Sequence, residues 1–517
     1  MPSDKVVRFG GSMQEVIKQF EDGSTDAFDT IIEQLQDEET SMIKYNKFIV
    51  EIGDSAPLFT AAHKKLIKSL LYSKWATSHP TVLVNWKKTI LSLVSANNVH
   101  VSSILEHCVK SFVYETKDEL TEDENEKTME TQFSTVQQIL DEILEKVPLA
   151  RGQLLAQIAS GFPNGFGSEP AHEKYIDNLF KLIERHKTLR SPVLETILVH
   201  FCRIDQHLPK NVLFDLDLAA QEESEELTED QLEFLSARDT FDRIMIRFFQ
   251  FIETSVASDD EVGQKNNVLV LLREMVTVFG KVLLPQPNTT TVQYVYFYLL
   301  SLKGTFSTSF CEWMLKRIKN KSESRSRRIA LLSYLTSFLA RAQFVSHTTL
   351  RHVALILSTL CIKDHQRLIP EKDQHFSTEK FGVYYATAQA LFYLVIFRHK
   401  ELGNDCIRSL GIPEIVYSKM NPLAACVPSI ALKFCDIMKE TQLAFCHHIL
   451  EQFHERQLLA TGTNEIVNPI DFYFPFDRCL LPMTAAKIDK FYNHWVEEDS
   501  DSEDEDSSEE EESDMES

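Results

Sequence analysis

Residues 381–402 constrain the fold of this chain more than any other feature of its sequence. Their apolar side chains follow the i, i+3, i+4 and i+7 spacing of one helix face: Ala388, Leu391, Phe392 and Val395. Leu394 and Phe397 widen this stripe around most of the helix, so neighbouring elements must bury it on several sides. The helix is predicted to end at the cations 398–400, which suit the negative end of a helix dipole. We therefore expect an all-helical core with this helix at its centre.

The rest of the chain repeats short helical patterns. Apolar stripes of roughly three to four turns follow one another with almost no strand-like alternation. Pairs of stripes recur about every 40 residues, as in HEAT repeats. Glycine accounts for 15 of 517 residues, well below average usage, which disfavours a nucleotide-binding α/β enzyme. The sequence predicts an all-α, HEAT-repeat-like α-solenoid, a superhelical stack of antiparallel helix pairs.

Charge separates a globular part from a tail. We expect the solenoid to occupy residues 1–496, interrupted by acidic loops at about 117–128 and 215–233. Residues 497–517 contain fourteen Asp and Glu and no Lys or Arg. A segment with so much charge of one sign and so few apolar residues cannot form a core. It is predicted to be an acidic, disordered tail.

Several stretches of the sequence resemble a known family. They are YYATAQALFYLVIFRHKEL at 384–402, NPLAACVPSI at 421–430, LTSFLARAQF at 335–344 and NPIDFYFPFD at 468–477. Each is similar to a segment of the RNA polymerase I-specific transcription initiation factors, the growth-regulated initiation factor IA family. Further similar stretches in the same order extend the resemblance over most of residues 91–496.

The resemblance implies a HEAT-repeat protein that is not an enzyme. Such a protein would bind RNA polymerase I near its stalk and keep it competent to initiate. It would also bridge the polymerase to the promoter-bound core or selectivity factor for ribosomal RNA synthesis, under control of phosphorylation. The same resemblance implies a location in the nucleus and nucleolus, with a cytoplasmic pool as an option. A homodimer of the free protein is left open, because solenoids have long edges.

The sequence contains no recognisable catalytic or cofactor motif. It lacks a phosphate-binding glycine loop, a zinc-protease motif and a nucleophile elbow. The nine cysteines are scattered, without a Cys-x-x-Cys pair, and are typical of reduced thiols in the cytosol or nucleus. We expect no enzyme activity, cofactor, metal or membrane partner. The alternative function is a HEAT-type nuclear transport receptor or a general protein-interaction scaffold.

Three serines are candidates for a phospho-regulated, polymerase-docking surface. The resemblance implies a serine-containing docking surface on the N-terminal repeats, and Ser102, Ser103 and Ser168 lie in the similar stretches. Ser168 follows Gly165, Phe166 and Gly167, where the family usually has basic residues. A phosphate adds a charge of roughly −1.5 to −2, which would disrupt an interface matched to a neutral serine. The alternative is that all three are ordinary loop serines.

One basic cluster stands out in this acidic protein. Seven cations and a single Glu fall within residues 316–328. The cations are Lys316, Arg317, Lys319, Lys321, Arg325, Arg327 and Arg328. Clustered Lys and Arg favour a docking patch for DNA or for an acidic partner. The alternative is a solvated basic helix end and turn.

The acidic tail contains candidate phosphorylation sites. Ser500, Ser502, Ser507 and Ser508 each have an acidic residue three positions later. This spacing suits an acidophilic kinase. The alternative is a tail that only adds solubility.

Overall fold

A computed structural model describes residues 12–37, 39–163, 169–208, 210–219, 228–257, 265–286, 289–367, 378–451 and 474–494. The chain divides into two compact units. Unit 1 comprises Met1–Phe310 and Cys479–Lys487, and unit 2 comprises Cys311–Arg478 and Ile488–Ser517. Within the described residues the regular structure is helical, apart from one isolated bridge between Ala342 and Tyr492. The predicted all-helical fold is confirmed.

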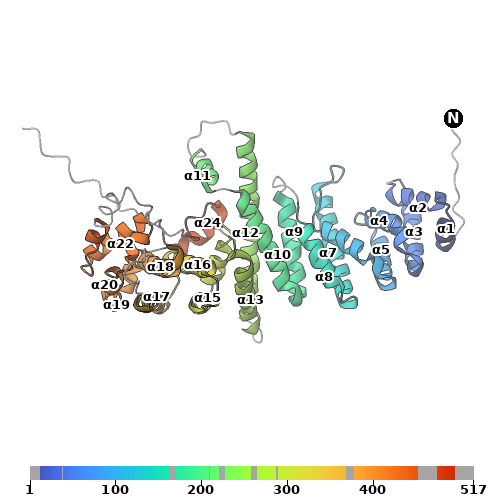
Figure 1. Ribbon diagram of the computed structural model, residues 1–517. Coiled ribbons are helices and arrows are strands. Elements are labelled where there is room, and N and C mark those ends of the chain that lie inside the picture. The colour runs from blue at the N-terminus through green and yellow to red at the C-terminus, as the bar shows by residue number, and fades with distance from the viewer. Residues whose placement is uncertain are drawn as a thin grey trace, which may run out of the picture. The chain divides into compact units, whose positions relative to one another are not determined.

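Unit 1 stacks its helices in two layers, in which each helix packs on the next of its own layer (Figure 1). The first layer contains α3 (Met42–Asp54), α5 (Pro80–Ala96), α7 (Glu122–Lys146), α9 (Glu169–Arg185), α12 (Glu229–Ala257) and α14 (Tyr294–Ser301). The second contains α2 (Asp26–Gln36), α4 (Lys64–Leu71), α6 (Val101–Lys110), α8 (Ala150–Ser160), α10 (Arg190–His207) and α13 (Lys265–Val278). Because the chain alternates between layers, each pair of successive helices forms one repeat.

Shorter elements complete unit 1. α1 (Met13–Glu21) packs on α2, and α11 (Lys210–Ala219) packs on α12. The connections carry the 3₁₀ turns η1 (Ala56–Leu58), η2 (Ala61–His63), η3 (Asn98–His100) and η4 (Lys187–Leu189) and the π-helical turn η5 (Phe279–Leu283). α15 (Gly304–Lys319) begins in unit 1 and ends in unit 2.

The chain returns to unit 1 close to its C-terminal end. There α24 (Pro482–Ile488) begins against α12, where the buried Asp242 carboxylate accepts hydrogen bonds from Met483 N (2.6 Å) and Thr484 N (2.8 Å). These two amides belong to the first turn of α24 and have no carbonyl partner within that helix. Asp242 therefore caps a helix that lies more than two hundred residues away in the sequence.

Hydroxyl groups tie neighbouring helices of unit 1 together. Thr89 Oγ1 donates to Ile49 O (2.9 Å) between α5 and α3, and Tyr175 OH donates to Ile158 O (2.8 Å) between α9 and α8. The first contact needs a glycine, because a Cβ at Gly53 would lie only 2.6 Å from Thr89 Oγ1. Such bonds satisfy buried hydroxyls and fix the register between repeats.

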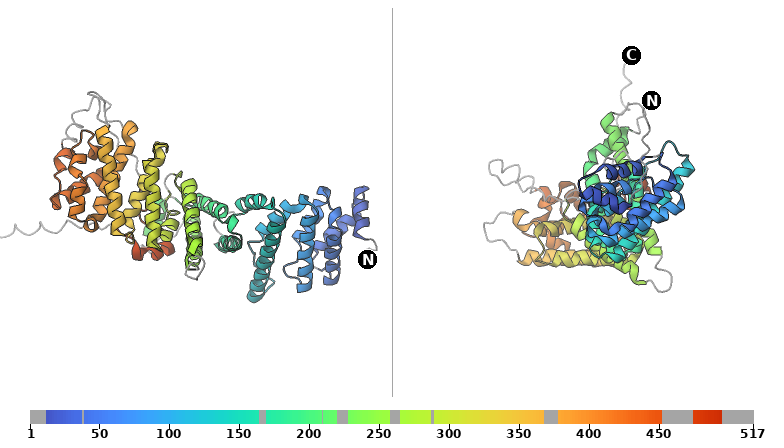
Figure 2. Two further views of the ribbon diagram at one scale, coloured as in Figure 1. Left: turned by 90° about the horizontal axis from the view of Figure 1, so that it is seen from below. Right: turned by 90° about the vertical axis from the view of Figure 1, so that its right-hand side faces the viewer.

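Unit 2 is built around one helix, α18 (Thr378–Leu402), as the apolar stripe predicted (Figure 2). Three long helices pack against α18, namely α16 (Arg325–Arg341), α17 (His347–Arg367) and α22 (Pro428–Glu440). The remaining elements are short: α19 (Asn404–Ser409), α20 (Ile412–Val416), α21 (Pro422–Ala425) and η6 (Asp489–Phe491). Residues 384–396 of α18 are almost entirely buried, which explains why apolar side chains surround this helix.

α18 is also long enough to be compared with a membrane span. Among the described helices, Lys380–Leu402 alone has the length and apolar composition to cross a bilayer. However, 83% of its most apolar window is buried inside the protein. This is the pattern of the core helix of a folded unit.

Arg398 has a different role from the one predicted. It was expected to interact with the dipole of its own helix, but its side chain is buried and points to the end of α16. Arg398 Nη1 donates to Leu339 O (3.1 Å) and to Ala342 O (2.9 Å). The backbone departs from helical geometry at Arg398 (φ −130°, ψ 21°). One guanidinium thus binds carbonyls that α16 leaves without a partner at its C-terminal end.

The acidic loop predicted at 117–128 is wrong from residue 122 onward, where α7 begins. Thr121 and Glu124 form a capping box, with Thr121 N donating to Glu124 Oε2 (3.0 Å) and Glu124 N to Thr121 Oγ1 (3.3 Å). The acidic residues of this first turn suit the positive end of the helix dipole.

The loop predicted at 215–233 is also partly wrong. Residues up to Ala219 belong to α11, and α12 begins at Glu229. Residues 220–227 lie outside the described residues, and so does the predicted tail, 497–517. The single solenoid expected over 1–496 stays a prediction.

Candidate functional site

Two of the three candidate serines lie together at the start of α6. Ser102 and Ser103 are the second and third residues of this helix, and Ser102 is exposed while Ser103 is half-buried. Exposed apolar side chains flank this end of the layer: Val99 just before α6 is 50% exposed and Leu149 just before α8 is 78% exposed. Two hydroxyls beside exposed apolar groups are chemically suited to contact a protein partner.

The third candidate, Ser168, lies outside the described residues. Gly161, which directly follows α8, lies at the opposite end of α6 from Ser102 and Ser103. A Cβ at Gly161 would be only 2.6 Å from Val109 Cγ1. Val109 is in the last turn of α6, about 10 Å along the helix axis from Ser102. Ser102 and Ser103 therefore form a surface of their own at the start of α6.

A negative charge at Ser102 or Ser103 is compatible with the helix itself. The first turn of α6 contains no acidic residue. A carboxylate or phosphate there would face the positive end of the helix dipole, which is favourable by roughly 0.3–1 kcal/mol. Consequently, a loss of binding caused by such a charge would report on the interface and not on unfolding of α6.

The opposite end of α6 carries a buried histidine. The His107 ring meets the stacked rings of Trp75 and Trp86 edge-on, at centroid distances of 6.1 and 6.2 Å. Burial lowers the pKa of His107 to about 4. This side chain also lines a cavity of about 300 Å³ between the α4–α5 connection, α6 and α7. Its neutral imidazole belongs to the packing of unit 1.

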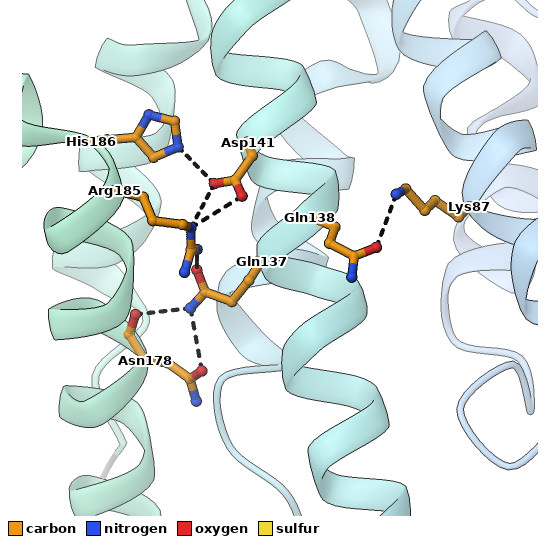
Figure 3. Close-up of polar contacts among 7 residues, drawn as sticks. All are labelled: Lys87, Gln137, Gln138, Asp141, Asn178, Arg185 and His186. Atoms are coloured by element: carbon orange, nitrogen blue, oxygen red, sulfur yellow. Dashed lines mark hydrogen bonds and ion pairs between the residues drawn. The ribbon is translucent and has the colours of Figure 1, made fainter.

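The first layer of unit 1 contains a polar seam across α5, α7 and α9 that sequence analysis did not identify (Figure 3). Gln137 Nε2 donates to Asn178 O (2.9 Å), and Arg185 Nε donates to both Asp141 oxygens (3.1 Å each). His186 Nε2 lies 2.7 Å from Asp141 Oδ1, and Lys87 Nζ donates to Gln138 Oε1 (3.0 Å). The i, i+4 spacing of Gln137 and Asp141 is a sequence signal that could have indicated one polar stripe on α7.

This seam braces the layer and shows no catalytic arrangement. Hollows of about 550 and 600 Å³ open along it, one lined by α7 and α9 and the other by α5 and α7. Across the described part of the chain, no three His, Cys, Asp or Glu side chains come close enough to hold a metal ion. Eight of the nine cysteines are buried, so their thiols pack as small apolar groups.

The seven predicted cations come together where α15 ends and α16 begins, and we call them the basic corner: Lys316, Arg317, Lys319, Lys321, Arg325, Arg327 and Arg328. Arg317 and Arg328, which are half-buried, hold the two helix ends together. Arg317 Nε donates to Glu323 Oε1 (2.7 Å), and Arg328 Nε donates to Ile318 O (2.8 Å) at the end of α15. The other five cations are exposed.

The charges of the basic corner oppose the dipole of α16. Ser324 Oγ caps this helix by accepting a hydrogen bond from Arg327 N (3.3 Å). Three arginines then occupy the first turn and beginning of the second, close to the positive end of the dipole. This placement is unfavourable for the helix by a few tenths of a kcal/mol per charge. The corner therefore presents a positive field at a helix end that this charge does not stabilise.

Comparison with known proteins identifies the family. The family model "RNA polymerase I specific transcription initiation factor RRN3" matches residues 9–500. The chain belongs to this family. The RNA polymerase I-specific transcription initiation factor RRN3 of Mus musculus is 28% identical over 97% of this chain and 83% of its own length. The rrn3 factor of Schizosaccharomyces pombe is 22% identical over 84% of this chain and 77% of its own length.

A solved structure of an RRN3-family protein has the same fold. The crystal structure of RNA polymerase I transcription initiation factor Rrn3 matches with a TM-score of 0.72 and 22% identity, over 93% of this chain and 96% of that chain. The expected family, the helical-repeat fold and the function in RNA polymerase I-specific transcription initiation are confirmed. The family implies a nuclear location and supports the initiation-factor interpretation instead of the transport-receptor alternative.

Sequence analysis thus located the candidate surfaces only in part. Ser102 and Ser103 are accessible at one helix start, and the basic corner is a single cluster. The tail serines Ser500, Ser502, Ser507 and Ser508 lie outside the described residues. Their phosphorylation stays a prediction.

Proposed function

We propose that this RRN3-family protein binds RNA polymerase I through the surface around Ser102 and Ser103 at the start of α6. One observation carries this assignment: two accessible hydroxyls lie at a helix end flanked by exposed apolar side chains. Uncharged hydroxyl groups next to apolar surface can be buried at an interface at low desolvation cost, whereas a phosphate cannot. The surface is therefore suited to binding that phosphorylation switches off.

The remaining steps follow the family resemblance. The protein contacts the polymerase near its stalk and keeps the enzyme competent to initiate. A second surface bridges it to the promoter-bound core or selectivity factor, and the protein leaves after initiation. It acts in the nucleolus, with a cytoplasmic pool, and the free protein can form a homodimer. The chain works as a scaffold, because affinity in such a bridge comes from extended surfaces.

The basic corner is proposed as an auxiliary contact. Its five exposed cations could bind DNA weakly near the promoter or an acidic surface of a partner. Phosphorylation of Ser322, Ser324 or Ser326 would reduce its positive charge. Binding through this corner should decrease steeply with salt, as expected for contacts between Lys or Arg and phosphates.

The test of the main proposal is binding to purified RNA polymerase I by the wild type and by Ser102→Asp/Ser103→Asp. We expect at least a tenfold loss of affinity in the variant. Ser429→Asp is a matched control, because Ser429 is also exposed and is the second residue of a helix, α22, in unit 2.

The outcomes separate four cases. Loss of binding in the α6 variant alone supports the proposed surface. Equal loss in both variants would indicate a general charge effect. Unchanged binding in both would move the docking surface elsewhere, and no binding by the wild type would contradict the proposed polymerase contact.

A further inference from the structure

The basic corner presents lysines that form no ion pair with an acidic side chain of the described residues. Lys316, Lys319 and Lys321 are exposed, and no described carboxylate lies within ion-pair distance of them. Within residues 316–328 Glu323 is the single acid, and it is occupied by Arg317 (2.7 Å) and Arg327 (4.0 Å). The corner also includes the positive dipole end of α16. It therefore attracts an anionic segment.

The C-terminal segment of the same unit is fixed at the other end of α16. Asn493 N donates to Arg341 O (2.7 Å), and Gln343 N donates to Phe491 O (3.1 Å). Tyr492 forms the isolated bridge with Ala342. The chain beyond residue 494 therefore starts at the C-terminal end of α16, while the basic corner lies at its N-terminal end. Both ends belong to unit 2.

The chain beyond residue 494 can reach the basic corner. α16 has 17 residues, so its two ends lie about 25 Å apart at about 1.5 Å per residue. The middle of the acidic stretch 503–516 is about 16 positions beyond residue 494, and a random-coil chain of about 16 residues has a root-mean-square end-to-end distance of about 20–24 Å. The effective concentration of a tethered segment at its site is highest, in the millimolar range, when the root-mean-square length of the tether matches the distance to the site.

We propose that residues 503–516 of the acidic tail dock on the basic corner of their own chain and mask it from other polyanions. These residues contain ten Asp and Glu and no cation, which complements the five exposed cations. Each contact is weak, but the tether makes binding intramolecular, so that no high intrinsic affinity is needed.

Phosphorylation would change how strongly the tail covers the basic corner. Phosphates on Ser502, Ser507 or Ser508 would add negative charge to the tail and strengthen the contact. Phosphates on Ser322 or Ser326 would weaken it, because they would lie among the lysines and arginines of the corner. The proposal does not depend on polymerase binding.

Zero-length carbodiimide cross-linking of the full chain tests the proposal, because it joins a lysine to a carboxylate in direct contact. At low salt we expect cross-links from residues 503–516 to Lys316, Lys319 and Lys321. Lys64 and Lys68 of α4 are the control, since they form another exposed group of lysines; Lys65 between them is left out because it pairs with Asp29 (2.9 Å). A mixture of ¹⁵N-labelled and unlabelled chains distinguishes links within one chain from links between two.

The proposal is supported if cross-links to the corner exceed those to α4 at least fivefold and join residues of one chain. Equal linking to both lysine groups, links between chains or no links to the corner would overturn it.

A second measurement uses a fluorescent 20-residue polyglutamate as a probe. A variant with Asn and Gln in place of the tail Asp and Glu should bind the probe at least tenfold more tightly than the wild type. Equal affinity would overturn the masking. The gain should disappear in Lys316→Gln/Lys319→Gln/Lys321→Gln, and its persistence there would place the masked surface elsewhere.

Discussion

The two units solve the burial of apolar helices in different ways. In unit 1 each helix packs on its neighbours in two layers, and polar ties such as Thr89 to Ile49 join adjacent repeats. In unit 2 one helix, α18, is surrounded by α16, α17 and α22. Stability in the first case is a sum of local contacts, whereas in the second case every contact shares one central helix. A single substitution should therefore have local effects in unit 1 and effects throughout unit 2.

The largest effect is expected for Arg398→Met in unit 2. The buried guanidinium holds Leu339 O and Ala342 O of the chain at the end of α16, and its loss leaves buried carbonyls without a partner. At about 1–3 kcal/mol for each buried carbonyl, we expect a loss of about 2–5 kcal/mol in the free energy of unfolding of unit 2. Hydrogen exchange should accelerate together in α16, α18 and α22. Arg408→Met, which removes an exposed cation, is the control and should change stability by less than about 0.5 kcal/mol. Acceleration confined to α16 would contradict a shared core.

In unit 1 the corresponding test is the pH dependence caused by His107. Burial lowers the pKa of its ring to about 4, whereas in the unfolded chain it takes up a proton near pH 6.5. The unfolded state therefore binds more protons between these values, and stability falls as the pH drops from 6.5 to 4. At pH 5 the loss should be roughly 2 kcal/mol, measured by hydrogen exchange of α5 and α6.

His107→Gln should remove the His107 contribution of roughly 2 kcal/mol at pH 5, whatever its effect on absolute stability. A weaker pH dependence of the same sign should remain, because burial also lowers the pKa of His63, His100 and His200 in unit 1. His352→Gln, at an exposed position of α17, should leave the full pH dependence unchanged. The same pH dependence in both variants would exclude His107 as its source.

The sequence predicted what depends on local patterns. The wide apolar stripe of 381–402 correctly indicated a central helix, because burial on all sides requires apolar side chains all round. It could not show that Arg398 serves α16, since the partner of a buried cation depends on which distant carbonyls lack a donor. Asp242 and Thr484 illustrate the same limit across 242 positions. The start of α7 was different, because Thr121-x-x-Glu124 is a capping signature visible in the sequence.

That capping box gives a third prediction. Thr121→Ala should cost about 1 kcal/mol, because Glu124 N loses its acceptor. In a stack of local contacts the effect should be limited to the first turns of α7, with faster hydrogen exchange there and no change in α5 or α9. Thr131→Ala is the control, since Thr131 lies within the same helix and its hydroxyl donates to Lys127 O (2.8 Å), away from the cap. Faster exchange across all three helices would mean that unit 1 is as cooperative as unit 2.

The smallest effect is expected at the N-terminal end of α16 in unit 2, where the arginines of the basic corner oppose the helix dipole. Arg327→Gln removes a cation from the first turn of α16, which should stabilise the helix, and loses a 4.0 Å ion pair with Glu323, which contributes little when exposed. We expect a net gain of about 0.3 kcal/mol, measured in the variant with the neutral tail so that tail docking does not contribute. Lys439→Gln, in the last turn of α22, should have the opposite sign, because a cation there suits the negative dipole end. Both effects should shrink in high salt. Equal losses of stability in Arg327→Gln and Lys439→Gln would mean that the position of a cation along its helix does not matter. The cations of the basic corner would then not be unfavourable for α16.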